Sequence, residues 1–277
     1  MKPAPFEYVR ADTVEDAVRV LAGAADDALP LAGGQSLLPL LGLRMAAPRI
    51  LVDIGRIADL HRAEDLGDRV LVGAATTHAE IEDGTIPDPG RGLMRNVAKR
   101  IAYRAVRNQG TIGGSVAMAD PAADWPACLL ALEADARVVG PGGARTVALP
   151  DLVEDVYTTS LRPGEIIVAF EVPHLDAGAR TGLAKVSKKT GAFAMSIAIA
   201  ILNDGGRPAR VVLAGAGPKA IRLPATSDLV QSASPTEREV RSAVARDLEE
   251  SGAAIDDYAL RLHGAVVMRA LAEAQAQ

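Results

Sequence analysis

Cysteine is almost absent from this 277-residue sequence, which contains only Cys128. One thiol excludes an internal disulfide framework and any cysteine-based zinc or iron–sulfur site, because such sites need several thiolates. Aromatic residues make up only 3% of the chain, which argues against base-stacking surfaces for single-stranded nucleic acid. The net charge of -5 provides no attraction to a phosphate backbone. We therefore expect no nucleic-acid partner.

Several other signatures are missing. The longest apolar run, residues 194–202, is far shorter than the roughly 20 residues that span a bilayer, and residues 1–7 contain no secretory-type apolar run. We therefore expect a cytoplasmic protein that does not span a membrane. Neither a Gly-x-Ser-x-Gly elbow nor a Walker-type loop is present, so no catalytic residue is predicted. The four histidines lack metal-site spacing, and we expect surface or capping roles for all of them: His61, His78, His174 and His263.

The first 55 residues or so have the pattern of a small α/β unit. Thr13 is a candidate helix N-cap with Asp16 three residues later. Apolar residues at helical spacing then predict a helix over residues 14–24. Short apolar runs predict strands over residues 28–31 and 49–54.

The next part of the chain, residues 56–175, alternates between strand and helix patterns. The predicted strands cover residues 69–75, 136–139, 144–149 and 165–172, and the predicted helices cover residues 76–82, 92–103 and 124–133. Residues 140–143 are rich in glycine and predict a hairpin between two of these strands.

A polar segment, residues 174–180, is the predicted domain boundary. The strands predicted beyond it cover residues 182–187, 193–202 and 209–214, with a tight turn at Asp204-Gly205-Gly206 and helices from Thr226 onward. Strands followed by helices predict an α+β arrangement, in which one face of an antiparallel sheet is covered.

Two glycine pairs, each predicted to be a loop, stand in similar surroundings and are the strongest chemical signal. The first is Ala-Gly-Gly-Gln-Ser-Leu at residues 32–37, and the second is Thr-Ile-Gly-Gly-Ser at residues 111–115. Glycine lets backbone N–H groups turn toward an anion, and neighbouring hydroxyls add donors. Each pair could also be an ordinary tight turn or bulge. The residues by themselves therefore indicate a possible phosphate-binding protein.

A third glycine motif, Gly-Ala-Gly-Pro-Lys-Ala at residues 215–220, has the spacing of a dinucleotide fingerprint. That fingerprint needs a helix to begin at its third small residue, but Pro224 follows within about one turn. No acidic strand end appears roughly 20 residues on. We therefore interpret this motif as a loop that ends a strand.

The two glycine pairs belong to a longer series of segments that resembles the flavin subunits and domains of the molybdenum hydroxylases. The series comprises Ala-Gly-Gly-Gln-Ser-Leu-Leu-Pro from residue 32, Arg-Asn-Gln-Gly-Thr from 107, Thr-Ile-Gly-Gly-Ser from 111, Asp-Pro-Ala-Ala-Asp from 120, Gly-Glu-Ile-Ile from 164 and Lys-Val-Ser-Lys-Lys from 185. The similarity is to the medium subunit of aerobic carbon monoxide dehydrogenase and the flavin domain of xanthine dehydrogenase.

This resemblance implies an FAD-binding domain over residues 1–175, of the vanillyl-alcohol-oxidase (PCMH) type, with subdomains of about 1–55 and 56–175. A carboxy-terminal domain of the carbon monoxide dehydrogenase flavoprotein type, an antiparallel sheet with helices, would follow over residues 176–277. The implied cofactor-binding residues are Ala32, Gly33, Gly34, Gln35, Ser36, Leu37, Ile101, Thr111, Gly113, Gly114, Ser115, Asp124, Ile167 and Lys185.

Some of these roles have alternatives. The glycine segments would wrap the diphosphate and ribityl chain, while Ile101, Ile167 and Lys185 would lie near the flavin. Asp124 would accept hydrogen bonds from cofactor groups, or it could simply cap a helix. Lys185 could instead be a solvated strand lysine. Gln35 stands where relatives often carry His, and the segment at Ile101 departs from the common pattern.

The resemblance also implies a role in electron transfer. FAD on this chain would receive electrons from a small 2Fe-2S subunit, after a large molybdenum-cofactor subunit has oxidised the substrate, and would pass them to an external acceptor. We expect a dimer of heterotrimers. Carbon monoxide, a purine, an N-heterocycle and an aldehyde all remain possible substrates, and quinone, NAD and oxygen remain possible acceptors. The alternatives are a stand-alone FAD-dependent oxidase or reductase and an assembly protein without cofactor.

Overall fold

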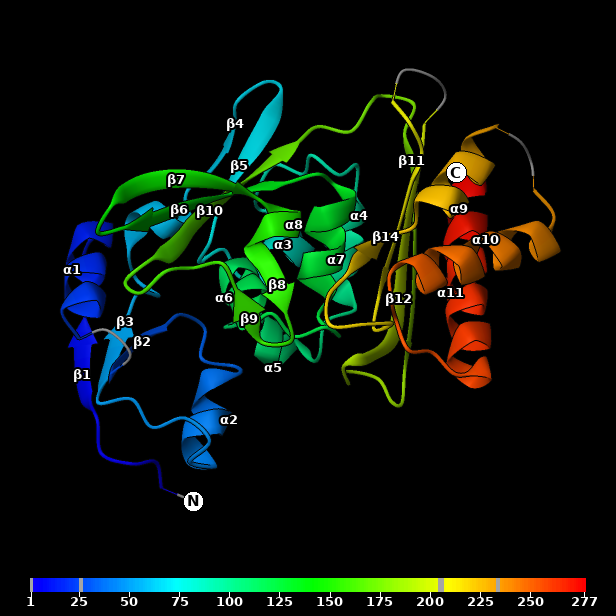
Figure 1. The fold of residues 1–277 in the computed structure, drawn as a ribbon. Coiled ribbons are helices and arrows are strands. Elements are labelled where there is room, and N and C mark those ends of the chain that lie inside the picture. Colours follow the sequence, from blue (N-terminus) through cyan, green and yellow to red (C-terminus); the bar gives the residue numbers. More distant parts are fainter. Residues whose placement is uncertain (1, 25–26, 204–206, 233–234) are drawn as a thin grey trace.

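The computed structural model describes residues 2–24, 27–203, 207–232 and 235–277. The main sheets follow one another along the molecule, with the amino-terminal unit at one end and the last helices at the other (Figure 1). The α+β class predicted from the sequence is confirmed. The predicted turn at residues 204–206 lies outside the described residues. Within the described ranges, no helix is both long and apolar enough to cross a membrane.

The amino-terminal unit is a small parallel sheet covered by one helix. Its strands lie in the order β1 (Glu7–Arg10), β3 (Ile50–Asp53), β2 (Ala28–Leu31), and α1 (Val14–Ala24) packs against β2 and β3. Thr13 Oγ1 accepts the Asp16 N–H at 3.1 Å, which confirms the predicted cap. Strand β1 and helix α2 (Leu37–Gly42) were not predicted. Strand β1 is an edge strand without apolar alternation, and α2 is too short to show a helical period.

The middle of the chain forms an antiparallel five-stranded sheet with short helices beside it. The strand order is β4 (Ala63–Asp65), β5 (Arg69–Gly73), β10 (Ile166–Pro173), β6 (Asp135–Gly140), β7 (Gly143–Ala148). Beside it lie η2 (Ala58–His61), α3 (His78–Asp83), α4 (Leu93–Lys99), α5 (Arg104–Arg107), α6 (Ile112–Met118), α7 (Asp124–Ala131), α8 (Leu149–Leu152) and the pair β8 (Val153–Asp155) and β9 (Thr158–Thr159). Gly140 pairs with Gly143, so the predicted hairpin is confirmed.

Two predictions for this region are wrong. The helix expected over residues 92–103 ends at Lys99, because the chain turns sharply at Ala102, whose φ is +39°. The second glycine pair is not a loop, since Gly113 and Gly114 lie in the first turn of α6. Glycine is a poor helix former, so sequence propensity did not indicate a helix there.

The last part of the chain is a four-stranded antiparallel sheet followed by helices, as predicted. The strands lie in the order β11 (Arg180–Ser187), β12 (Ala194–Leu202), β13 (Arg210–Ala214), β14 (Ile221–Arg222), and the helices are α9 (Pro224–Ser232), α10 (Glu237–Glu250) and α11 (Asp257–Gln275). The expectation that only one face of this sheet is covered is wrong. Helix α11 packs on one face, and α7 contacts β12 and β13 from the other.

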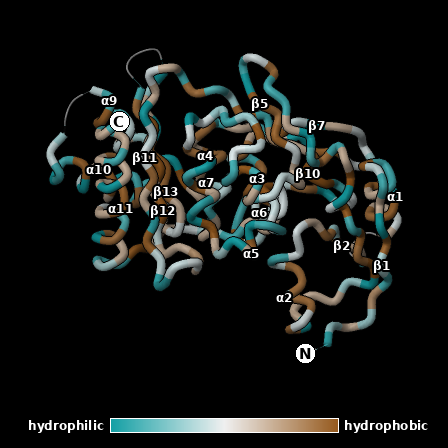
Figure 2. Tube along the Cα trace, turned by 180° about the vertical axis from the view of Figure 1, so that it is seen from behind, coloured by the Kyte–Doolittle hydropathy of each residue, from teal (hydrophilic) through white to brown (hydrophobic). Residues whose placement is uncertain are grey.

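Burial on both faces explains the continuous apolar run in β12. Ile197 and Ile199 join the apolar cluster of the middle region, which contains Trp125, whereas Ala198 and Ala200 pack with the last helices. Alternate residues of a strand point to opposite faces, so a strand covered on both sides must be apolar throughout. Figure 2 shows this hydrophobic layer between the helices. The core therefore continues across the predicted boundary near residue 175.

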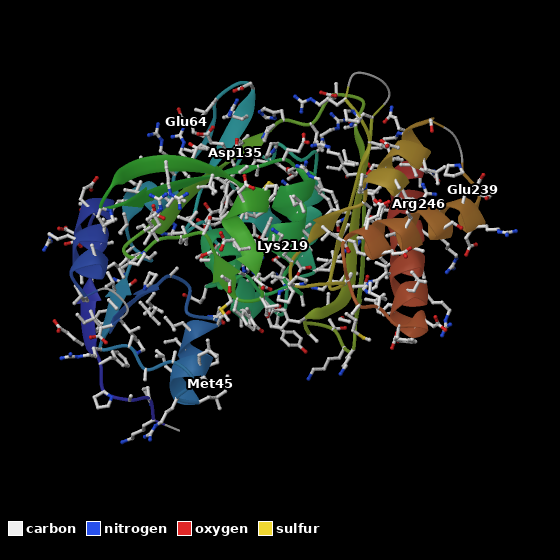
Figure 3. The ribbon with its side chains drawn as sticks, viewed as in Figure 1. Met45, Glu64, Asp135, Lys219, Glu239 and Arg246 are labelled. Atoms are coloured by element: carbon white, nitrogen blue, oxygen red, sulfur yellow. The ribbon has the colours of Figure 1, made fainter. Side chains whose placement is uncertain are left out.

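The third glycine motif is a loop that ends β13, as predicted. Strand β14 follows it, with no helix at the required point. The Gly215 N–H donates to the Pro121 carbonyl at 3.2 Å, and Lys219 Nζ donates to the carbonyls of Pro150 at 3.0 Å and Val153 at 2.9 Å. Figure 3 shows Lys219 beside the helices of the middle region. The loop thus joins the last sheet to the middle of the chain.

Gly182 tests how closely β11 approaches α11. A Cβ at this position would lie 1.8 Å from the Ala270 carbonyl oxygen. We expect Gly182→Ala to lower the free energy of unfolding by about 1–3 kcal/mol, because overpacking forces the backbone apart. Gly23→Ala is the matched control: a Cβ there meets no atom within 4 Å, and alanine favours the helix by about 0.5–1 kcal/mol. Urea unfolding measures the free energy of unfolding of both variants. A similar change in Gly182→Ala and Gly23→Ala would contradict the close approach of β11 to α11.

Candidate functional site

The first glycine segment leaves hydrogen-bond donors unused. It follows β2, turns at Gly34, whose φ is +69°, and enters α2. The backbone N–H groups of residues 33–36 donate no hydrogen bond to any residue that the structure describes. Ser36 is the N-cap of α2, but its side chain makes no cap hydrogen bond. This segment therefore presents several N–H groups and a hydroxyl without a partner in the described chain.

The second segment uses its donors differently. The N–H groups of Ile112 and Gly113 donate to the carbonyls of Thr76 at 3.0 Å and Ala74 at 2.9 Å. The Gly114 N–H donates to Thr111 Oγ1 at 3.1 Å. These bonds anchor the start of α6 to the end of β5. The expectation that both glycine pairs offer free N–H groups is therefore wrong for the second pair. The N–H groups of Gly113 and Gly114 already donate to acceptors within the chain.

Backbone packing explains two of the glycines. A Cβ at Gly33 would lie 2.0 Å from the Gln109 carbonyl oxygen, so the two segments touch backbone to backbone. A Cβ at Gly113 would lie 2.6 Å from the Ala74 Cβ. Neither position can carry a larger residue without moving the chain. Gly33 and Gly113 are therefore structural requirements of the site.

Gly114 is different, because the protein does not fill the space beside it. Gly114 is exposed, and a Cβ there would meet only the capping Thr111 Oγ1 at 2.9 Å and Ala32 Cβ at 4.0 Å. Helix α3 has the same threonine cap with Glu80 at the equivalent position, so this cap tolerates a side chain. The open face at Gly114 thus suits a ligand that approaches the backbone closely.

The donors around this face fit a diphosphate. The unused N–H groups of residues 33–36 lie on the segment that packs against the backbone just before α6, and the hydroxyl of half-buried Ser115 has no hydrogen-bond partner among the described residues. N–H and O–H donors match the oxygens of a phosphate group without any lysine or arginine. The residues present therefore fit the diphosphate of a dinucleotide cofactor.

Asp124 and Lys185 form a buried ion pair across the two parts of the chain. Lys185 Nζ lies 2.9 Å and 2.8 Å from the Asp124 carboxylate oxygens and 3.0 Å from the Arg100 carbonyl oxygen. The Lys185 side chain is only 8% exposed and the Asp124 side chain only 7% exposed. The alternative of a solvated lysine is therefore wrong, and the Asp124 carboxylate accepts hydrogen bonds from Lys185. Burial raises the pKa of Asp124, and the Lys185 ammonium opposes this rise.

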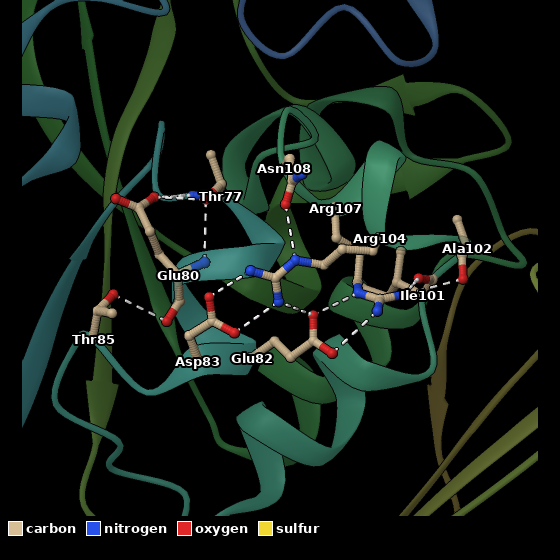
Figure 4. Close-up of polar contacts among 10 residues, drawn as sticks. All are labelled: Thr77, Glu80, Glu82, Asp83, Thr85, Ile101, Ala102, Arg104, Arg107 and Asn108. Carbon is tan, nitrogen blue, oxygen red and sulfur yellow. Dashed lines mark hydrogen bonds and ion pairs between the residues drawn. The ribbon is translucent and has the colours of Figure 1, made fainter.

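Ile101 follows Arg100 and is held in place by a cluster of ion pairs. Arg107 donates to the Ile101 carbonyl at 2.8 Å and to the Ala102 carbonyl at 3.1 Å. Its Nε lies 2.8 Å from Glu82 Oε2, and Arg104 also contacts Glu82 (Figure 4). The turn after α4 is thus clamped beside the Asp124–Lys185 pair. The predicted site residues Ile101, Asp124 and Lys185 are therefore close together.

Ile167 comes from another element, strand β10. Its side chain is 5% exposed and lies in the apolar core of the middle region. The strand bulges after it, and the neighbouring Val168 carbonyl accepts the Ala74 N–H at 2.9 Å. Ala74 also receives the Gly113 N–H, so β10 is connected with the start of α6 through this residue.

Two residues near the site, His78 and Trp125, were not identified by the sequence analysis. Trp125 Nε1 donates to His78 Nδ1 at 2.9 Å, and both side chains are buried. Burial, with a smaller contribution from Arg107, lowers the pKa of His78 to about 4. His78 is thus a neutral core residue, and the expectation of a surface or capping role is wrong. It is also wrong for His263, which is buried and lies 2.9 Å from Ser196 Oγ.

A weak signal for this pair exists in the sequence. A tryptophan in an apolar helix needs an acceptor for its N–H when it is buried. The acceptor is 47 positions away, and no local pattern identifies it.

Comparison with known proteins places the chain among flavin subunits. Residues 4–175 match a family described as the FAD binding domain in molybdopterin dehydrogenase. The alpha subunit of the 6-hydroxypseudooxynicotine dehydrogenase complex of Paenarthrobacter nicotinovorans is 40% identical over 226 residues, which cover 80% of this chain and 76% of the relative. The carbon monoxide dehydrogenase medium chain of Hydrogenophaga pseudoflava is 33% identical and covers 100% of this chain and 99% of its own length.

A solved structure agrees with these sequence relatives. Carbon monoxide dehydrogenase from Hydrogenophaga pseudoflava, in a form that lacks the Mo-pyranopterin moiety of its molybdenum cofactor, contains a chain that superimposes with a TM-score of 0.92 at 35% identity. The match covers 100% of this chain and 99% of that chain.

The buried His78 predicts that the protein loses stability in acid. The unfolded chain protonates His78 near its ordinary pKa of 6.5, but the folded protein keeps it neutral down to about 4. Between these values the unfolded state binds more protons, so the free energy of unfolding falls as the pH falls, by up to about 3 kcal/mol. Urea unfolding near neutral pH and near pH ~4.5 measures the loss. His78→Asn, which cannot gain the charge, should lose less, and an equal loss would contradict the assignment.

Proposed function

The chain belongs to the family of FAD binding domains in molybdopterin dehydrogenases, and we propose that it holds FAD between its two glycine segments as the electron-transfer subunit of a molybdenum hydroxylase complex. The observation that carries the assignment is the open face at Gly114 beside the unused N–H groups of residues 33–36. An exposed glycine in the first turn of α6, near a segment whose N–H donors have no partner in the described chain, supports a bound diphosphate.

The site residues divide into three roles in this proposal. Residues 32–37 and Ser115 donate to the diphosphate and the neighbouring ribityl hydroxyls. Thr111 and Gly113 dock α6, so that Gly114 can face the cofactor. Ile101, Asp124, Ile167 and Lys185 surround the flavin end.

Asp124 is the group at the flavin end that can still form a hydrogen bond. An ammonium group has three N–H donors, and those of Lys185 are directed to the two Asp124 oxygens and the Arg100 carbonyl. The carboxylate keeps lone pairs for a cofactor hydroxyl or ring N–H. Lys185 therefore acts through Asp124, by fixing the direction of the carboxylate and balancing its charge in a buried place.

Bound FAD supplies the redox chemistry, because it can accept and release electrons. The chain binds the cofactor, orients it and limits its contact with water. The division into residues 1–175, with subdomains of about 1–55 and 56–175, and residues 176–277 is part of the proposal. The continuous core between these parts would keep the flavin end rigid.

An iron–sulfur cluster that donates electrons must lie outside these 277 residues, because Cys128 is the only cysteine and is buried. The relatives are a complex subunit and a medium chain. We propose that a small 2Fe-2S subunit supplies the electrons, that a large molybdenum-cofactor subunit oxidises the substrate, and that the complex is a cytoplasmic dimer of heterotrimers serving an external acceptor. The molybdenum subunit would then determine the substrate.

Gly114→Val tests the place of the diphosphate. A branched side chain there occupies the space that the phosphate needs, so we expect the FAD content of the purified protein to fall at least tenfold (about 1.4 kcal/mol) while the far-ultraviolet circular dichroism stays unchanged. Gly142→Val, in the β6–β7 hairpin where a Cβ meets nothing within 4 Å, is the control and should retain FAD. Visible absorbance per chain gives the FAD content, and full retention in Gly114→Val would show that the diphosphate binds elsewhere.

A second experiment separates the complex from a stand-alone flavoenzyme. The isolated, FAD-loaded chain should keep its flavin oxidised with carbon monoxide, a purine, an N-heterocycle or an aldehyde, because no group on this chain is proposed to oxidise them. Co-expressed with its molybdenum and iron–sulfur partners, the same flavin should be bleached by at least one of the four. Bleaching of the isolated chain would instead favour an independent oxidase or reductase.

A further inference from the structure

One buried hydrogen bond lies between the second glycine segment, where the diphosphate is proposed to bind, and the Asp124–Lys185 pair at the proposed flavin end. Trp125 is 0% exposed and His78 is 6% exposed, and the indole Nε1 lies 2.9 Å from His78 Nδ1. An indole N–H can only donate, so Nδ1 must accept, and the neutral imidazole carries its proton on Nε2. The bond therefore determines the tautomer and the orientation of His78.

His78 is attached to the second glycine segment. Its backbone N–H donates to the Gly110 carbonyl at 2.9 Å, and its ring packs against the Gly110 Cα, where a Cβ would lie 2.7 Å from Nε2. The preceding Thr77 forms an isolated bridge with Thr111. The ring thus rests on the backbone immediately before α6, whose first turn is the proposed diphosphate end.

Trp125 is attached to the flavin end. It follows Asp124 in α7, and Asp124 is held by Lys185 from β11. A displacement of the Trp125 ring would tilt the start of α7 and move the carboxylate with it. The hydrogen bond between Trp125 and His78 therefore connects Asp124, which precedes Trp125, with Gly110, which contacts His78.

We propose that His78 and Trp125 are positioning residues, which fix the distance and direction of the Asp124–Lys185 pair relative to the second glycine segment and so determine how the flavin ring lies when FAD binds. The inference rests on the proposed function, because it needs FAD to occupy both ends. Its essential element is the Nδ1 acceptor. An apolar side chain of similar size could fill the same space, but it would leave a buried indole N–H without a partner.

His78→Leu and His78→Asn separate the hydrogen bond from simple packing. Leucine removes the acceptor, whereas the asparagine Oδ1 takes nearly the place of Nδ1. We expect His78→Leu to weaken FAD binding about tenfold, to change the visible circular dichroism and reduction potential of the bound flavin, and to shift the fluorescence of Trp125, the only tryptophan in the sequence. His78→Asn should restore all four properties toward those of the wild-type protein.

Trp125→Phe provides an independent variant if His78→Leu does not fold. It keeps an aromatic ring and removes the N–H, and it should change the dichroism and potential of the flavin in the same direction. Normal FAD affinity, dichroism and potential in His78→Leu or Trp125→Phe would overturn the inference and leave the proposed function intact. Equal damage in His78→Leu and His78→Asn would also overturn it, because the acceptor would then be irrelevant. A wild-type chain that takes up no FAD would overturn the proposed function and this inference together.

Discussion

The contact between Gly33 and the Gln109 carbonyl, where a Cβ would lie 2.0 Å from the oxygen, is the constraint on which the site depends. It brings a segment of the amino-terminal parallel unit against the backbone that leads into α6. The neighbouring Ala32 Cβ lies 4.0 Å from where a Gly114 Cβ would stand, so the segment that carries the unused N–H groups passes near the open turn at Gly114. A larger residue at position 33 would push the two segments apart. The close backbone packing at Gly33 thus also positions the segment that is proposed to bind the diphosphate.

The electrostatics of the site follow from hydrogen bonds more than from free charge. The first segment has neutral N–H and O–H donors, and Lys185 donates its N–H groups to the Asp124 carboxylate and the Arg100 carbonyl. A buried ion pair with both partners in place avoids the large cost of an isolated buried charge. The neutral His78 adds a further buried polar contact without charge. This arrangement can hold a charged cofactor in a chain whose net charge is itself negative.

Local patterns predicted the elements well and their environment less well. The helix over residues 14–24, the β6–β7 hairpin and the sheet before the last helices were found because each has a local period or turn signal. The helical start of α6 was missed because its two glycines disfavour a helix; the N–H groups of Ile112 and Gly113 hold it to the carbonyls of Thr76 and Ala74, just after β5. The continuous apolar run of β12 is the signal of burial on both faces, but the run by itself does not identify α7 as the helix that covers the second face.

By itself, the sequence determined the α+β class, because its strand patterns are followed by helix patterns. It also determined the family and the set of candidate FAD-binding residues, because the paired glycines and their companion segments occur in a specific order along the chain. Only the tertiary structure decided which glycines are required by packing and which face open space. It also decided that Asp124 and Lys185 are one ion pair and that His78 is the partner of Trp125. These contacts join residues 61 and 47 positions apart, and side chains that meet only after the chain has folded leave no periodic signal in the sequence.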